Sequence, residues 1–166
     1  SDKRGTLITF KPDPSIFVYT LEYSYDTLAS RLRELSYLNK GITITLTDKR
    51  HKNEEGEFET ETFYSEEGLS EFIRYLDATR DPLMKDVIAF EGEKNGVPVE
   101  VAMIYNTSYA ENLHSYVNNI NTHEGGTHLS GFRRGLTHTL KKYADNSGML
   151  DKLKFDVAGD DFREGL

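Results

Sequence analysis

The sequence contains no cysteine, which excludes disulfide bonds, catalysis by a thiolate and zinc held by cysteine ligands. A chain without cysteine fits the reducing cytoplasm, where we expect this protein to work. No segment approaches the roughly 20 apolar residues of a membrane-spanning helix, so no membrane partner is predicted. The first four residues are polar and no apolar run follows them, so they are not expected to be a secretory signal. Internal repeats and low-complexity tracts are also absent.

Basic residues are in deficit, because 20 lysines and arginines face 28 aspartates and glutamates, for a formal net charge of -8. A free-standing nucleic-acid binder is usually basic, so this balance argues against one. Much of the acidic excess lies in one stretch, at Glu54, Glu55, Glu57, Glu59, Glu61, Glu66, Glu67 and Glu71. We interpret that stretch as a solvated hairpin and helix start, with a specific cation or a basic partner as the alternative.

The length of 166 residues predicts one domain, or one domain with a tail. A compact chain of this size buries about 70% of its unfolded surface, enough to fold without disulfides or metals. Apolar residues alternate with polar ones in several short stretches, which predicts strands at 6–10, 42–47, 57–64, 86–93, 97–105, 113–120 and 154–157. Pro12 and Pro14 stop the first of these.

Helical spacing of apolar residues predicts helices over 26–37 and from 65 onward, capped by Asp26 and Ser65. The inward residues would be Leu28, Leu32 and Leu35 in the first helix, and Leu69, Phe72, Ile73 and Leu76 in the second. Gly41 suits the left-handed conformation after the first helix. Asn95-Gly96 predicts a tight hairpin turn. Strands and helices mix without βαβ regularity, so the predicted fold class is α/β (α+β), a two-layer sandwich.

A polar loop with two glycines, Gly125 and Gly126, precedes a third helix that we expect to end near 147–148. Thr127 is the predicted N-cap. The helix has an apolar stripe at Leu129, Phe132, Leu136, Leu140 and Tyr143, and its basic residues fall off that stripe, at Arg133, Arg134, His138, Lys141 and Lys142. Such a basic helix in an acidic chain is the strongest indication of function.

Several other patterns suggest chemistry but have simpler explanations. His128 and His138 are ten residues apart on one helix, about 15 Å, and cannot share a metal. The loop before the helix matches no nucleotide-binding glycine motif, so tight packing is favoured over an anion site. Asp160 and Asp161 lie near Arg163 and Glu164, and an ion-pair network or the cap of the next element explains them more simply than magnesium does. The ten tyrosines are expected to pack in the core and hairpins. No catalytic residue and no metal ligand is assigned.

Four segments, in the same order along the chain, carry a family resemblance. They are 5–13, 32–41, 121–129 followed by Gly131-Phe132-Arg133, and 159–166. The chain resembles the transducer domain of the DNA gyrase B family, the ATPase subunits of type IIA DNA topoisomerases. The resemblance marks a structural signature in the polar loop, at Thr122, His123, Gly125, Gly126, Thr127 and His128.

The resemblance implies a ribosomal-protein-like fold with a mixed sheet of about four strands and helices on one face. It implies that 1–13 is the tail of the ATPase domain and that 14–166 is the transducer domain, ending before the switch-lysine loop. The expected function is to couple ATP binding and hydrolysis to DNA strand passage and supercoiling. ATP and magnesium would bind elsewhere in the full-length protein, so this fragment is expected to hold no cofactor and to be inactive alone.

The implied partners are double-stranded DNA, the gyrase A protein and a second copy of gyrase B. The arginine of the family that matches Arg133 points into the cavity through which DNA passes, where it would contact phosphate without reading sequence. Arg134, Lys141 and Lys142 are further candidates for that cavity. An ordinary exposed cation is the alternative for Arg133. The alternatives for the chain are the corresponding ATPase subunit of topoisomerase IV and an autonomous nucleic-acid-binding module.

Overall fold

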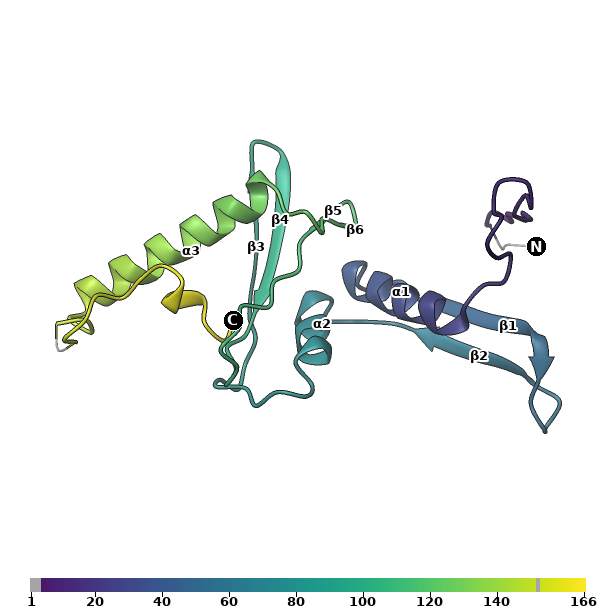
Figure 1. The fold of residues 1–166 in the computed structure, drawn as a ribbon, viewed down its shortest axis with the longest axis horizontal. Helices are drawn as coiled ribbons and strands as arrows, with labels where there is room; N and C mark the ends of the chain where they lie inside the picture. Colours follow the sequence, from purple (N-terminus) through teal and green to yellow (C-terminus); the bar gives the residue numbers. More distant parts are fainter. Residues whose placement is uncertain (1–3, 152) are drawn as a thin grey trace.

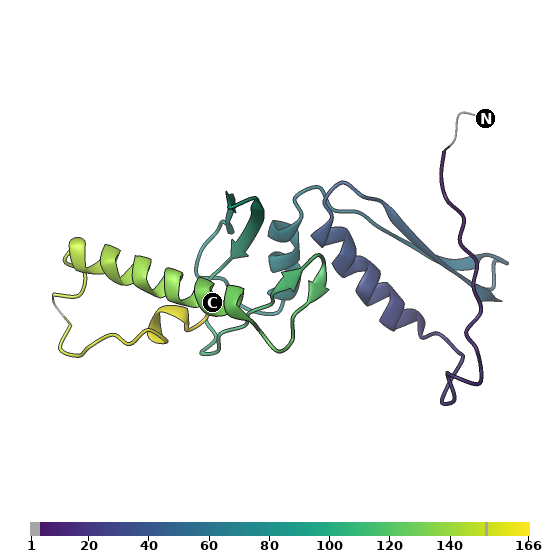
Figure 2. The ribbon, with the colours of Figure 1, turned by 90° about the horizontal axis from the view of Figure 1, so that it is seen from above.

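The computed structural model describes residues 4–151 and 153–166, and the first three polar residues lie outside that part. The elements run along an elongated molecule (Figures 1 and 2). A helix with a long hairpin lies at one end, a second helix and hairpin lie in the middle, and a third helix projects from the other end. The accessible surface is 13347 Å², whereas a compact 19.0 kDa chain exposes about 8,400 Å². The prediction of about 70% burial is therefore wrong for the chain by itself.

The first unit is helix α1 (Tyr25–Leu38) beside the hairpin of β1 (Ile44–Lys52) and β2 (Phe58–Phe63). Ser24, not Asp26, caps α1, because its hydroxyl accepts from the Thr27 amide at 3.3 Å. Leu28, Leu32 and Leu35 are half-buried, and Ala29 and Ser36 are the buried residues of the helix. Gly41 has the expected positive φ, 84°. The strands pair antiparallel from Ile44 opposite Phe63 to a bulge near the acidic turn.

The core lies where α1 meets α2 (Leu69–Leu76). Phe72 of α2 is buried and stacks on Tyr37 of α1, with 5.2 Å between ring centroids. The rings of His114 and Tyr116 close the cluster at 6.5 and 6.2 Å from Phe72. Burial and the neighbouring Glu34 carboxylate raise the pKa of Tyr116. Ser65 accepts from the Gly68 amide at 2.9 Å, just before α2 begins. One aromatic ring thus joins three separate segments.

The middle hairpin confirms the prediction at Asn95-Gly96. Strands β3 (Ile88–Lys94) and β4 (Val97–Met103) pair antiparallel, and the two turn residues have φ of 55° and 77°. A turn of this type needs positive φ at both positions, which asparagine and glycine tolerate. Helix α2 contacts both strands.

The single strand predicted over 113–120 is wrong, because the segment folds back on itself. Strands β5 (Tyr116–Val117) and β6 (Ile120–Asn121) form a small hairpin. Asn118 and Asn119 turn the chain with φ of 50° and 65°. Arg31 donates to the Asn119 carbonyl at 2.7 Å, and the Asn119 amide donates to Asn39 at 2.8 Å. The turn is therefore anchored on the end of α1.

The mixed α/β class is confirmed, but the strands do not form one mixed sheet of about four strands. The described residues contain three two-stranded antiparallel sheets. Helix α2 stands between the β1–β2 and β3–β4 hairpins, so the edges of these hairpins do not meet (Figure 1). Residues 6–10 and 154–157 are not strands either. No neighbouring strand offers them hydrogen bonds, and Leu7, Ile8 and Phe10 are exposed.

Helix α3 (Thr127–Asn146) is followed by an irregular segment and a 3₁₀ turn, η1 (Asp161–Arg163). The last residues return to 106–112, where the Asn106 amide donates to the Gly165 carbonyl at 2.8 Å. The Asn112 amide donates to the Leu166 carbonyl at 2.7 Å. Gly165 has φ of 78°, and a Cβ there would lie 2.5 Å from the Asn106 carbonyl oxygen. Only glycine fits this position.

We therefore expect Gly165→Ala to lower the free energy of unfolding by about 1–3 kcal/mol from backbone strain, and further from the clash. The matched control is Gly131→Ala in α3, where nothing lies within 4 Å of the new methyl group. This control should raise stability by about 0.5–1 kcal/mol, because alanine favours the helix. Urea unfolding of both variants measures the difference, and equal effects would contradict the close approach at Gly165.

Candidate nucleic-acid interface

The polar loop before α3 is held by Thr122. Its hydroxyl donates to the Ser115 carbonyl at 3.0 Å and lies 3.2 Å from Nε2 of His128. Gly126 lets the His128 ring approach, because a Cβ on this glycine would lie 2.7 Å from that ring. Tight packing of the loop thus accounts for these members of the signature. His123 is exposed and makes no side-chain hydrogen bond within 4–151 and 153–166.

Helix α3 begins one residue earlier than its predicted cap implies. Gly126 takes the boundary position, no side chain caps the first turn, and Thr127 is already helical. The apolar stripe is half-buried at Leu129, Phe132, Leu136 and Leu140. Tyr143, the last member of the predicted stripe, is 62% exposed. The reason is that η1 is the only other labelled element of the described chain that contacts α3, so little covers the far end of the helix.

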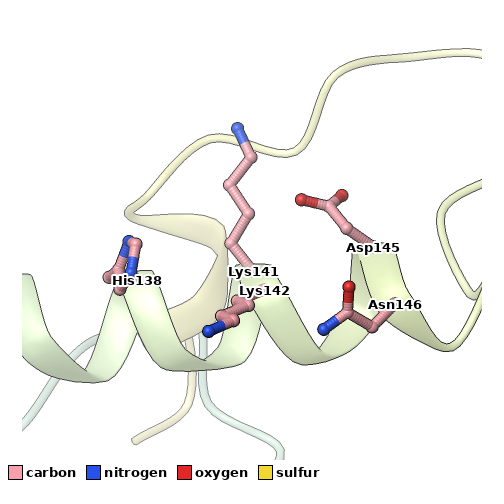
Figure 3. Close-up of a pocket in the computed structure, with 5 residues that line it drawn as sticks. All are labelled: His138, Lys141, Lys142, Asp145 and Asn146. Carbon is pink, nitrogen blue, oxygen red and sulfur yellow. The ribbon is translucent and has the colours of Figure 1, made fainter.

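The four cavity candidates do not form one cluster. With about 100° per residue, Arg134 and Lys141 lie on the same side of α3, about a quarter turn from Arg133. Lys142 lies about opposite Arg133. Arg134, Lys141 and Lys142 are all exposed. His138, Lys141, Lys142, Asp145 and Asn146 surround an open hollow of ≈ 300 Å³. In Figure 3, Lys141 and Asp145 rise from the same side of the helix, so an acidic group accompanies the lysines.

Arg133 is not a free cation. Its Nε donates to Oε1 of Glu111 at 2.9 Å, and its side chain is 41% exposed. This hydrogen bond raises the pKa of the Arg133 guanidinium, so the group stays charged. Glu111 engages only Nε, and within the described residues Nη1 and Nη2 of Arg133 make no hydrogen bond. The outer edge of the guanidinium can therefore meet an anion while its inner edge is held.

Arg163 completes this group. Its Nη1 donates to Oγ1 of Thr137 at 2.6 Å and to the Gly159 carbonyl at 2.9 Å, and its Nη2 pairs with Asp160. The predicted ion pairs at 160–164 are confirmed for Asp160, whereas Asp161 accepts from the Ala158 amide at 2.7 Å. Sequence reasoning missed Glu111. It lies in an irregular segment, 22 residues from Arg133, and no periodic signal marks it.

Two classes of site find little support in the described part of the chain. No group of three histidine or carboxylate side chains is placed to hold a metal ion there. No helix that the structure describes is long and apolar enough to cross a membrane. Helix α3 carries Arg133, whose guanidinium is bound to Glu111 on one edge only, and the exposed cations Arg134, Lys141 and Lys142. Such an arrangement suits contacts with phosphate groups, which position a duplex without reading its sequence.

Comparison with known proteins gives one consistent family. The family model of DNA gyrase B matches residues 68–166. The chain is 62% identical over its whole length to the DNA gyrase B protein of Eisenibacter elegans and, also at 62%, to that of Cytophaga hutchinsonii. It covers 34% of each of these relatives, so it spans about a third of their length. Among solved structures it is similar to the 43K ATPase domain of Thermus thermophilus gyrase B, solved in complex with an aminocoumarin. That likeness has a TM-score of 0.79 at 31% identity and covers 94% of this chain and 41% of that one.

Proposed function

Because the chain belongs to the DNA gyrase B family, we propose that it is the transducer part of a longer ATPase subunit of a DNA gyrase. The observation that carries this proposal is the match to gyrase B proteins along the whole chain. The large uncovered apolar surface supports it, because flanking parts of a longer protein would cover such faces. Residues 1–13 would be the tail of the ATPase domain and 14–166 the transducer domain.

In the full-length protein, ATP and magnesium would bind outside this chain, and no catalytic residue is assigned here. Nucleotide binding would change the orientation of α3, and through it the hold on a DNA segment that is passed through a break in another. The partners would be double-stranded DNA, the gyrase A protein and a second copy of gyrase B, in the cytoplasm. Coupling between nucleotide and DNA requires two conformational states of the protein, and each ligand must bind one of these states more tightly than the other.

We propose that Arg133 contacts phosphate with the free edge of its guanidinium, and that Arg134, Lys141 and Lys142 add phosphate contacts on other sides of α3. Each phosphate contact releases counterions, so the logarithm of DNA affinity falls with the logarithm of salt by about 0.9 per contact. A basic helix in an acidic chain supports this assignment, because the excess negative charge lies elsewhere, chiefly over 54–71, from the turn before β2 to the start of α2.

The test is the salt dependence of DNA binding by the full-length protein. We expect the double variant Lys141→Gln, Lys142→Gln to reduce the slope of log affinity against log salt by about 1–2. The matched control, Lys49→Gln with Lys52→Gln, removes the same charge from β1 and should leave the slope unchanged. Equal slopes in both double variants would refute a DNA contact at these lysines. If the 166-residue chain alone bound short nucleic acid with micromolar affinity, it would instead be an autonomous binding module.

A further inference from the structure

The Glu111 carboxylate lies between two arginines that come from different elements. Its Oε1 accepts from Nε of Arg133 in α3 at 2.9 Å and lies 3.3 Å from Nε of Arg163 in η1. Glu111 itself belongs to the segment that pairs with the C-terminal residues. All three side chains are partly or largely buried, with exposed fractions of 22% for Glu111, 41% for Arg133 and 13% for Arg163. One carboxylate oxygen thus faces two donors.

Only one of these donors is satisfied. In the part of the chain that the structure describes, Nε of Arg163 is the one buried side-chain nitrogen or oxygen without a hydrogen bond. The other nitrogens of this guanidinium are engaged by Thr137, Gly159 and Asp160. A buried donor without a hydrogen bond is unfavourable, because it has lost its hydrogen bonds to water. Nε of Arg163 thus has only the ion-pair attraction of Glu111 at 3.3 Å, and Glu111 would give it a hydrogen bond by shifting from Arg133 to Arg163.

Resting on the proposed phosphate contact of Arg133, we propose that Glu111 is a positioning residue that exchanges between the two arginines. Without DNA it holds Nε of Arg133. A phosphate that takes over Arg133 releases the carboxylate, which then accepts from Nε of Arg163. The new hydrogen bond at Arg163 offsets part of the free energy that is lost when the Arg133–Glu111 pair breaks. The exchange draws η1 toward residues 105–112, so that DNA at α3 changes how firmly the C-terminal segment is held.

Exchange of Glu111 between the two arginines leads to an outcome that neither simple electrostatics nor a purely structural role gives. Removing Glu111 eliminates a competitor for Arg133, so DNA binding should become tighter. The same change removes the group that relays the contact, so DNA should stimulate ATP hydrolysis less. Electrostatics alone predicts tighter binding with undiminished stimulation. A purely structural role predicts weaker DNA binding and weaker stimulation of hydrolysis, together with a lower Tm.

The experiment compares Glu111→Ala with Glu164→Ala in the full-length protein. Glu164 lines the same hollow as Glu111 and Arg163, is exposed, and forms no ion pair within the described residues. DNA affinity, the factor by which saturating DNA raises ATP hydrolysis, and Tm are measured for each. For Glu111→Ala we expect affinity to rise about twofold to fivefold and the stimulation factor to fall about fivefold or more. Glu111→Gln keeps an acceptor oxygen, so its DNA affinity and stimulation factor should lie between those of Glu111→Ala and the parent. Glu164→Ala should keep full stimulation.

Three results overturn the proposal. The first is Glu111→Ala behaving as Glu164→Ala does, the second is tighter binding with full stimulation, and the third is loss of affinity, stimulation and Tm together. Arg133→Gln separates these failures from failure of the proposed function. If Arg133→Gln binds DNA as the parent does, the phosphate contact itself is wrong. If Arg133→Gln weakens binding while Glu111→Ala matches its control, only the exchange is wrong.

Discussion

Replacing Phe72 with alanine is expected to lower the free energy of unfolding by about 3–5 kcal/mol, the usual cost of removing a buried phenylalanine. Phe72 is one of the few buried apolar residues of the described chain, which are Ala29, Phe63, Phe72 and Ala144. Its ring packs on Tyr37 of α1 and on His114 and Tyr116, so the partners come from two segments far apart in sequence. With so small a core, a loss of this size approaches the whole stability of a typical domain.

The matched control is Phe90→Ala, which makes the same chemical change on β3. Phe90 is 49% exposed, so its truncation returns much less surface to water and should cost about 1 kcal/mol or less. Urea denaturation of the two variants, followed by tyrosine fluorescence and circular dichroism, gives both values. If Phe72→Ala cost no more than Phe90→Ala, the aromatic cluster would not be the centre of the fold.

The sequence predicted the features that depend on a few neighbouring residues. Asn95-Gly96 specifies its turn by its own backbone preferences, so the β3–β4 hairpin was predictable. The stripe from Leu129 to Leu140 repeats with a helical period, so α3 was predictable to within one or two residues at each end. Arg133 could be named as a candidate only through the family resemblance, because its place beside that stripe fits an ordinary exposed cation equally well.

Features that depend on distant parts of the chain were not predictable. Glu111 acquires its position only when residues 105–112 pair with the C-terminal end, and nothing in its own neighbourhood indicates two arginine partners. The Asn118-Asn119 turn competes with a continuous strand, and its anchor on Arg31 and Asn39 lies about 80 residues away. The strand over 6–10 failed for the same reason, since a strand requires a neighbour that local sequence does not supply.

Replacing Arg133 with glutamine in the full-length protein is the change with the largest expected effect on function. Glutamine keeps a polar side chain but is shorter and lacks the positive charge that a phosphate would meet. We expect the stimulation of ATP hydrolysis by DNA to fall about tenfold or more, with basal hydrolysis retained, because we propose that the nucleotide site lies outside this chain. Supercoiling by the complete enzyme should fall in parallel. Arg74→Gln is the matched control, since Arg74 of α2 pairs with Glu67 at 2.5 Å and α2 makes no contact with α3 in the described residues.

Whether nucleotide and DNA are coupled through α3 is tested most directly by measuring the affinity of the full-length protein for a DNA duplex with and without a non-hydrolysable ATP analogue. Coupling between two binding sites is reciprocal, so if DNA changes the affinity for the analogue, the analogue must change the affinity for DNA by the same factor. We predict a change of about fivefold or more in the parent and almost none in Arg133→Gln. Two results would contradict a role for this helix in transmitting nucleotide binding to DNA. One is a DNA affinity of the parent that is the same with and without the analogue. The other is an effect of the analogue on DNA affinity that is as large in Arg133→Gln as in the parent.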